Sequence, residues 1–368
     1  MIDTSILIKR KIIAENQDIN AFFDEISAKI FADNETRTNF SDLLKSGHIA
    51  LSTSAYANLN NPKSAIALEF KSLDLLDEYI YSGVGMGFNL SKFSNPIEVL
   101  EQINSYLKSK EKEVNRPPAA IALLDISHSK IIDFITIKDK RDYENWCFNL
   151  SVIIDDEFLK NTDNRTYQTL INSMKKSGEP GIIFSNNKDF NCDCCAASEL
   201  KTNQGLTLAQ INLSKFYDNE FNFDLLSKSA EVLSSALENI APDGFISVLG
   251  YQDLLNKMGL NYGSIEALEI LEKCLMTIKT SSKVKMCISP TGATSRILKT
   301  TPSIEPDHKT NTSYIEEINT LKVAQKYLDG GISKTILLKK ESTTNDVDSI
   351  IKYSKQCNLK GITVFPAQ

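Results

Sequence analysis

The sequence predicts an α/β fold, arranged either as a barrel or as a doubly wound sheet. Short apolar runs alternate with longer amphipathic stretches through most of the chain, which is the pattern of consecutive β and α elements. The 368 residues are enough for one large α/β unit or for two to three smaller domains. A composition of 42% hydrophobic and 24% charged residues is typical of a folded globular protein.

The first predicted element is helical. Apolar residues between positions 12 and 46 recur at spacings of three and four, which places them on one face of a helix. Seven short apolar runs then follow as candidates for buried strands. These runs are 65–70, 121–124, 148–154, 181–184, 284–288, 335–338 and 361–365. The helical stretches between them are 95–108, 155–176, 223–241, 264–281, 313–328 and 344–356.

Charge and hydropathy exclude two classes of function. The formal net charge of −6 comes from scattered acidic residues, and no long block of lysine and arginine offers a surface for nucleic acid. No apolar run reaches the roughly 18 residues of a membrane span, and the N-terminus lacks the apolar region of a signal peptide. We therefore expect a cytoplasmic protein that binds neither nucleic acid nor membranes.

Two hydroxyl-rich turns are candidates for binding phosphate. One is Ser52-Thr53-Ser54, whose hydroxyls can bind phosphate or ribose oxygens, or can instead cap a helix. The other follows the strand candidate 284–288 and combines a glycine turn with three hydroxyls, so it predicts either a phosphate cradle or an ordinary N-cap. This second turn consists of Pro290, Thr291, Gly292, Ala293, Thr294 and Ser295.

Three glycines alternate with apolar residues at Gly83, Gly85 and Gly87. This spacing differs from the fingerprint of dinucleotide-binding proteins. It indicates a backbone that turns sharply or that another part of the molecule approaches closely.

Three of the seven cysteines, Cys192, Cys194 and Cys195, lie within four positions. No CxxC pair and no nearby histidine completes a tetrahedral set, so we expect no metal, although a zinc site remains a competing interpretation. A reactive thiol with a neighbouring acid and a surface loop are the other interpretations. The four solitary cysteines are expected to be buried apolar residues, and a disulfide framework is not expected in a reducing compartment.

Taken in order, these segments resemble the catalytic subunit of ribonucleotide reductase, particularly the cobalamin-dependent type. The resemblance runs from about residue 46 to residue 365 and depends on many short collinear motifs. Besides the two hydroxyl turns, they include Gly87-Phe88-Asn89-Leu90-Ser91, Asp125-Ile126-Ser127-His128, Phe148-Asn149-Leu150-Ser151-Val152, Glu179-Pro180-Gly181-Ile182, Leu249-Gly250-Tyr251-Gln252-Asp253, Ile332-Ser333-Lys334-Thr335 and Lys360-Gly361-Ile362-Thr363-Val364.

The resemblance implies a ten-stranded α/β barrel of two five-stranded halves, with a central finger loop that carries a cysteine. Residues 1–46 would form a helical N-terminal segment packed on the barrel, and residues 47–368 the barrel itself. The loop cysteine would become a thiyl radical that removes hydrogen from the ribose 3′ carbon. The substrate phosphates would bind the turn from Pro290 to Ser295 and the turn Ser52-Thr53-Ser54.

The sequence differs from the family at the residues that would carry out the reaction. Counting back from Ile211-Asn212-Leu213 places Cys195 at the thiyl position, with Cys194 as the alternative, and a two-residue slip makes Glu199 the family's acid. The family's reducing thiol pair falls in 65–68 and at Leu206, where this chain has no cysteine.

Two functions are therefore open. The first is a ribonucleotide reductase-like enzyme that acts on a ribonucleotide with adenosylcobalamin as the radical source. Its reducing thiols would come from Cys192, Cys194 or an external thiol donor, and a homodimer is the candidate assembly. The second is a catalytically inactive homologue that binds nucleotides or regulates a partner.

Overall fold

The computed structural model describes residues 2–138, 146–307 and 312–366, which fall into two compact units. Unit 1 comprises residues 1–64 and 206–330, and unit 2 comprises residues 65–205 and the chain from residue 331 onward. The N-terminal helices pack within unit 1 against α9. Within the described residues, no helix combines the length and apolarity needed to cross a bilayer.

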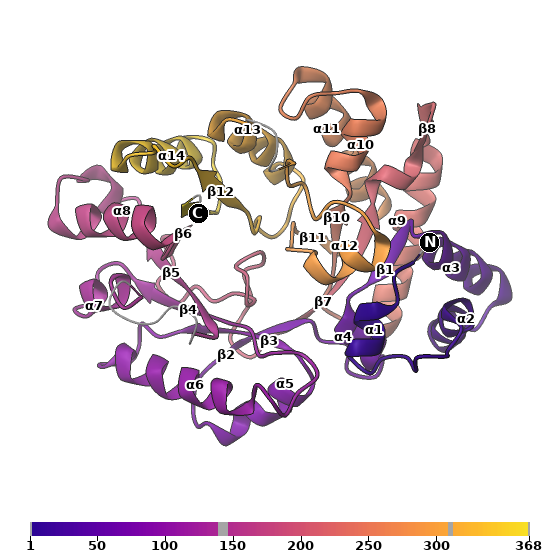
Figure 1. Cartoon of the computed structure of the whole chain (residues 1–368), viewed down its shortest axis with the longest axis horizontal. Helices are drawn as coiled ribbons and strands as arrows, with labels where there is room; N and C mark the ends of the chain where they lie inside the picture. Colours follow the sequence, from indigo (N-terminus) through magenta and orange to yellow (C-terminus); the bar gives the residue numbers. More distant parts are fainter. Residues whose placement is uncertain (1, 139–145, 308–311, 367–368) are drawn as a thin grey trace. The chain divides into compact units, whose positions relative to one another are not determined.

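Unit 2 is built on a parallel sheet in the order β2-β3-β4-β5-β6, with β13 antiparallel beside β6 and β12 parallel to β13. All six residues of β4 are buried, as expected for a parallel strand that is covered on both faces. The helices α5 to α8 lie on one side of this sheet (Figure 1). The strands are β2 (Ala65–Leu68), β3 (Gly85–Asn89), β4 (Ala120–Asp125), β5 (Phe148–Ile154), β6 (Gly181–Phe184), β12 (Thr335–Leu338) and β13 (Gly361–Pro366). The helices are η1 (Asp74–Leu76), α5 (Asp77–Tyr81), α6 (Pro96–Lys110), α7 (Ile131–Ile135), η3 (Phe158–Lys160), α8 (Arg165–Ser177) and α14 (Thr344–Gln356).

In unit 1, β7 pairs antiparallel with β1 and parallel with β10, and β10 pairs parallel with β11. Its strands are β1 (Ile49–Leu51), β7 (Gly205–Asn212), β10 (Gly244–Leu249) and β11 (Lys285–Met286), with a separate hairpin of β8 (Tyr217–Asp218) and β9 (Glu220–Phe221). Its helices are α1 (Ser5–Lys9), α2 (Ile19–Ile30), α3 (Asn34–Ser46), α4 (Thr53–Ala57), η4 (Leu213–Phe216), α9 (Phe223–Ile240), α10 (Tyr251–Met258), α11 (Ile265–Ser281), α12 (Gly292–Leu298) and α13 (Tyr314–Gln325).

The predicted α/β class is confirmed, and the outcome at the level of elements is mixed. The strands predicted at 148–154, 181–184 and 335–338 and the helix predicted at 344–356 have the bounds of β5, β6, β12 and α14. The helical segment predicted over 12–46 is two helices. The first ends at Ile30, and Asp33 caps the second by accepting a hydrogen bond from the Thr36 N–H. Strands β1, β3, β7 and β10 and helix α10 were not predicted.

Candidate active site

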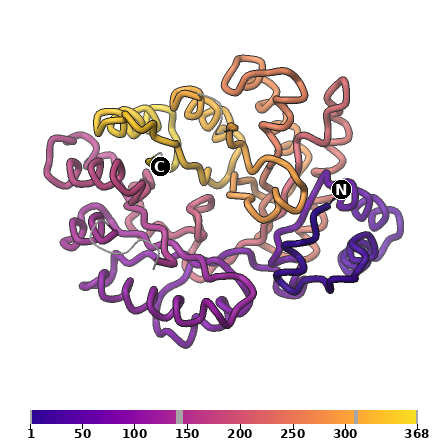
Figure 2. The backbone as a smooth tube through the Cα atoms, viewed as in Figure 1, coloured from indigo at the N-terminus to yellow at the C-terminus, as the bar shows by residue number. Residues whose placement is uncertain are grey.

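The cysteine-rich segment forms a finger loop, residues 185–204, that leaves β6 and lies against the inner face of the parallel sheet of unit 2 (Figure 2). Its closest approach is at β3, where a Cβ atom on Gly85 would overlap the Cys194 sulfur and one on Gly87 would overlap the Cys192 carbonyl oxygen. The predicted close approach at the glycine segment is thus confirmed, and the approaching part is the finger loop.

Hydrogen bonds fix this loop along its length. The Asn89 side-chain amide at the end of β3 donates to the carbonyl oxygens of Lys188 (2.9 Å) and Phe190 (2.7 Å). Further along, the Gly331 N–H donates to the Ala197 carbonyl oxygen at 2.7 Å. Because both ends of the loop are held in unit 2, its tip has a defined position over the sheet.

Cys192 anchors the loop through packing. It is fully buried in a cluster with sheet residues and pairs across the loop with Glu199 as an isolated β-bridge. Burial raises the pKa of the Cys192 thiol well above its ordinary value. These surroundings favour a packing role. The cluster consists of Ile121, Leu123, Ile153, Ile183, Phe190 and Cys192.

Cys195 lies at the tip, and its thiol donates a hydrogen bond to the Asp193 carboxylate. The same carboxylate accepts the backbone N–H groups of Cys195 (3.3 Å) and Ser198 (2.6 Å). Asp193 is almost completely buried, with 1% of its surface exposed. The acid next to Cys195 is therefore Asp193, whereas Glu199, which was expected to be the acid, is exposed.

The electrostatics of the tip favour a thiol. A hydrogen bond with Cys194, burial and the Asp193 carboxylate hold the pKa of Cys195 well above its ordinary value. Burial also raises the pKa of Asp193, against the effect of its hydrogen bonds from Cys195 and Ser198. Nucleophilic cysteines have a lowered pKa, whereas the raised pKa of Cys195 favours its thiol form.

The same tip offers three ligand atoms. One atom each from Asp193, Cys194 and Cys195 lies within 4.8 Å of the others. Structural zinc sites close with four ligands, and both Asp193 oxygens already accept hydrogen bonds from the loop. We therefore assign no metal to this group.

A cavity that is open to solvent adjoins Cys195 within unit 2. Its walls come from the finger loop, from β5 and β6, and from the segments 331–335 and 360–363. Glu199 lines this cavity together with Cys195, so the structure brings these two predicted residues to one space. Lys334 and Lys360 add cationic side chains to the lining.

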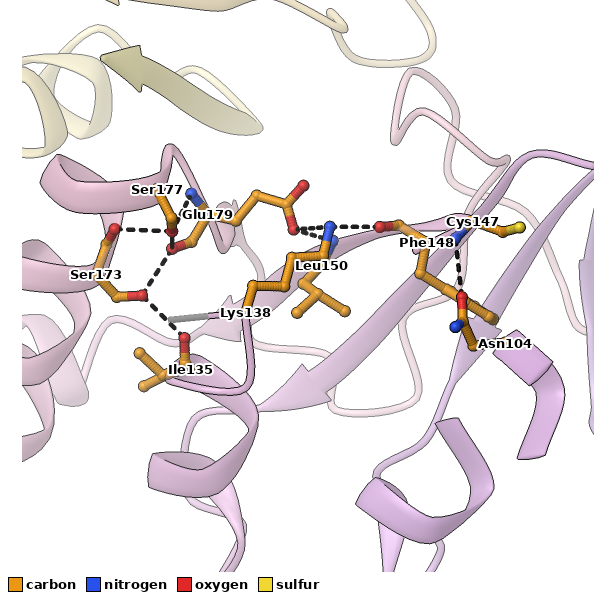
Figure 3. Close-up of polar contacts among 9 residues, drawn as sticks. All are labelled: Asn104, Ile135, Lys138, Cys147, Phe148, Leu150, Ser173, Ser177 and Glu179. Carbon is orange, nitrogen blue, oxygen red and sulfur yellow. Dashed lines mark hydrogen bonds and ion pairs between the residues drawn. The ribbon is translucent and has the colours of Figure 1, made fainter. Parts of the chain in front are cut away.

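A buried ion pair supports the strands β5 and β6 that line this cavity (Figure 3). The Lys138 ammonium lies 2.7 Å from Glu179 Oε2 and also donates to the Phe148 carbonyl oxygen. Glu179 in turn accepts the Leu150 N–H at 3.1 Å. Burial raises the pKa of Glu179, and the charge of Lys138 acts in the opposite direction.

The two hydroxyl turns lie in unit 1. Ser52 caps α4, and its hydroxyl contacts that of Ser64 at 2.8 Å, while Thr53 and Ser54 are buried. In the second turn, the Thr291 hydroxyl accepts the Ser303 N–H at 2.8 Å. The helix α12 begins at Gly292, with Thr291 at its N-cap position. Both turns therefore lie at the start of a helix. In this second turn Thr291, Thr294 and Ser295 are buried, Ala293 is half-buried, and Pro290 and Gly292 are exposed.

The N-terminal segment connects these two turns. The Asp3 N–H donates to the Ile297 carbonyl oxygen of α12, and the Arg10 guanidinium donates to the Thr53 hydroxyl. Arg10 thus places a positive charge at a predicted phosphate turn. Sequence reasoning missed it because 43 residues separate it from Thr53.

Comparisons with known proteins agree on one family. Residues 82–194 match the family model described as the barrel domain of ribonucleotide reductase. A vitamin B12-dependent ribonucleoside-diphosphate reductase of Thermoplasma acidophilum is 23% identical, over 77% of this chain and 57% of its own length. One of the same name from Mycobacterium tuberculosis is 22% identical, over 51% of this chain and 34% of its own length. The chain therefore spans less than two thirds of these curated relatives.

A solved structure extends the comparison to the whole fold. The class Id ribonucleotide reductase alpha subunit of Actinobacillus ureae superposes with a TM-score of 0.76, covering 100% of this chain and 98% of its own, at 14% identity. The fold is therefore the α/β barrel of these subunits, with helices preceding it, as predicted.

Proposed function

The chain is a divergent member of the ribonucleotide reductase large-subunit family, and on this premise we propose that it is a thiyl-radical enzyme that acts on the ribose of a ribonucleotide. The single observation that carries the proposal is the placement of Cys195. It lies at the tip of a fixed finger loop, borders a cavity and is held as a thiol by its neighbours.

In the proposed reaction the sulfur radical of Cys195 takes a hydrogen atom from the 3′ carbon of the ribose. The C–H bond breaks, an S–H bond forms, and the unpaired electron passes to the sugar. Loss of the 2′ hydroxyl as water then requires two electrons and two protons, which a dithiol supplies as it becomes a disulfide. The sugar radical recovers its hydrogen from Cys195, which regenerates the thiyl.

The reducing thiols are proposed to come from outside the barrel strands. Neither β2 nor the Leu206 position of β7 carries a cysteine, and Cys192 is enclosed in the apolar cluster. Cys194 remains a candidate relay because it is half-buried at the tip beside Cys195. We therefore propose an external thiol donor.

The substrate phosphates are proposed to bind the turn Thr291 to Ser295 and the turn Ser52 to Ser54. Hydroxyls and backbone N–H groups suit phosphate oxygens, and Arg10 adds a cation that can form charge-assisted hydrogen bonds. Arg10 supplies a positive charge for phosphate binding that neither hydroxyl turn contains.

The radical source is proposed to be adenosylcobalamin, as the names of the curated relatives suggest. The segments 331–335 and 360–363, which line the cavity at Cys195, would receive the reactive end of such a cofactor. When bound, the cofactor would supply the initial radical.

The test is reduction of a ribonucleotide by the purified chain with adenosylcobalamin and a dithiol. Formation of a deoxynucleotide that is lost in Cys195→Ala and kept in Cys357→Ala, a buried cysteine outside the loop, is the expected result. Equal turnover by wild type and Cys195→Ala would remove the proposed role.

A second candidate function is a non-catalytic nucleotide-binding or regulatory protein. It is favoured by one observation, the absence of cysteine from both strand positions where the family has its reducing pair. Nucleotide binding without hydrogen exchange at the 3′ carbon, under every activating cofactor tried, would support it.

A further inference from the structure

We propose that Asp193 is the positioning residue of Cys195: its carboxylate accepts the thiol hydrogen and holds the sulfur at the loop tip as a thiol. The inference deepens the proposed function, since it names the residue that prepares Cys195 for hydrogen-atom transfer. It also separates this role from Glu199, which the sequence comparison suggested as the acid.

The first argument is geometric. One Asp193 oxygen accepts both the thiol and the backbone N–H of Cys195, and the other accepts the Ser198 N–H at 2.6 Å. The Asp193 N–H also donates to the Ser198 carbonyl oxygen at 3.3 Å. Because the carboxylate ties two sides of the tip together, the thiol and the backbone that carries it are oriented by the same group.

The second argument is burial. Asp193 has 1% of its surface exposed, whereas Glu199 is exposed to solvent on the cavity side. Charges act more strongly on a neighbour when water is excluded. The carboxylate that governs the Cys195 thiol is therefore the buried one.

The third argument concerns reactivity. A negative charge beside a thiol disfavours the thiolate, which is the form that attacks electrophiles and disulfides. A cysteine kept as a thiol is protected from these two-electron side reactions. It retains the S–H bond that must form when a hydrogen atom is taken from a substrate and break when it is returned.

Other charged or titratable groups also face Cys195. Cys194 neighbours it on the loop, and Glu199, Lys334 and Lys360 line the cavity. A test must separate Asp193 from these groups. Glu199→Gln is the matched control, because it removes one carboxylate from the same cavity.

The experiment measures the rate at which iodoacetamide alkylates Cys195 as a function of pH, followed by mass spectrometry of the loop peptide. All variants carry Cys194→Ser, which retains a hydrogen-bonding side chain, and the buffers contain a chelator to exclude bound metal. Asp193→Asn should move the midpoint of the profile to lower pH by about one unit or more. Asp193→Glu should keep it near the parent value, and Glu199→Gln should leave it unchanged.

Coincident profiles for Asp193→Asn and the parent would overturn the proposal, as would an equal shift in Glu199→Gln. If Asp193→Asn does not fold, the parent protein, which carries only Cys194→Ser, can still contradict the proposal. Its native profile must lie at higher pH than that of Cys195 in the urea-unfolded chain, and a native profile at or below the unfolded one would contradict the proposal. No substrate or turnover is needed, so this result is independent of whether the chain reduces ribonucleotides.

Discussion

At Cys195, the charge of the neighbouring Asp193 carboxylate favours the thiol over the thiolate. Catalytic thiolates lie beside cations or helix N-termini, which lower the thiol pKa. Cys195 instead donates its hydrogen to a buried carboxylate, and its pKa is raised. Sequence counting reached the cysteine but not its partner, because a carboxylate two positions away contacts the thiol only once the loop has folded into its turn.

Arg10 is the residue whose role depends most on the phosphate assignment. Arg10→Gln should weaken ribonucleotide binding by about ten- to one-hundred-fold, because a charge-assisted hydrogen bond contributes about 1.5–3 kcal/mol. Calorimetric titration measures the dissociation constant. Lys9→Gln, which removes the same charge from the exposed neighbouring position, is the control and should bind as wild type does. Equal affinities in all three proteins would contradict a role of Arg10 in binding the phosphate.

The Lys138–Glu179 pair is a test of buried charge in unit 2. Lys138→Met leaves Glu179 without its partner and should lower the free energy of unfolding by about 3–5 kcal/mol at pH 7, measured by urea denaturation. Lys160→Met, which breaks the exposed pair with Glu157, should change it little.

The cost of Lys138→Met should depend on pH in a defined direction. The pKa of Glu179 is raised in the folded protein, so its protonated form is favoured there and its contribution is lost as pH rises through the folded value. Removing Lys138 raises that value further. The loss should therefore be smaller at pH 5 than at pH 7, and a larger loss at pH 5 would contradict the assignment.

At the level of elements, β3 and the finger loop depend on each other. Gly85-Met86-Gly87 has low intrinsic strand propensity, yet it forms a buried strand. The two glycines have no side chains, so the finger loop can lie directly against the strand backbone. The sequence indicated the close approach but not the strand. By contrast, β6 and β12 were predictable because each is a short apolar run with polar residues or glycine at its ends, and β5 because apolar residues alternate with Asn149 and Ser151 before a run of three.

Alanine at these glycines should be costly. A methyl group on Gly87 overlaps the Cys192 backbone, which cannot move aside, and one on Gly85 overlaps the Cys194 side chain. We expect Gly87→Ala to lower the free energy of unfolding by about 3 kcal/mol and Gly85→Ala by about 1–2 kcal/mol. Gly292→Ala, where no atom lies within 4 Å, is the control and should be neutral. Urea denaturation tests the order, and equal effects at all three positions would refute the docking of the loop on β3.

For the molecule as a whole, the sequence motifs resemble those of one family, and the comparisons find similarity to the same family. The barrel fold is that of the family, but the acid beside the thiol and the reducing pair are changed. No sequence motif identifies Asp193 or Arg10, because both act through contacts that only the folded chain makes. The proposed function therefore depends on the transfer of a hydrogen atom from a sugar to Cys195.

Exchange of hydrogen at the 3′ carbon tests that claim most directly. A ribonucleotide carrying deuterium at this carbon is incubated with the chain, adenosylcobalamin and a dithiol, and the label is followed by mass spectrometry. We expect part of the deuterium to leave the nucleotide with the wild-type chain, because the Cys195 thiol exchanges its hydrogen with water before returning it to the sugar, and we expect all of it to be retained with Cys195→Ala. Retention of all deuterium by the wild type, in a chain shown by calorimetry to bind the nucleotide, would contradict the claim.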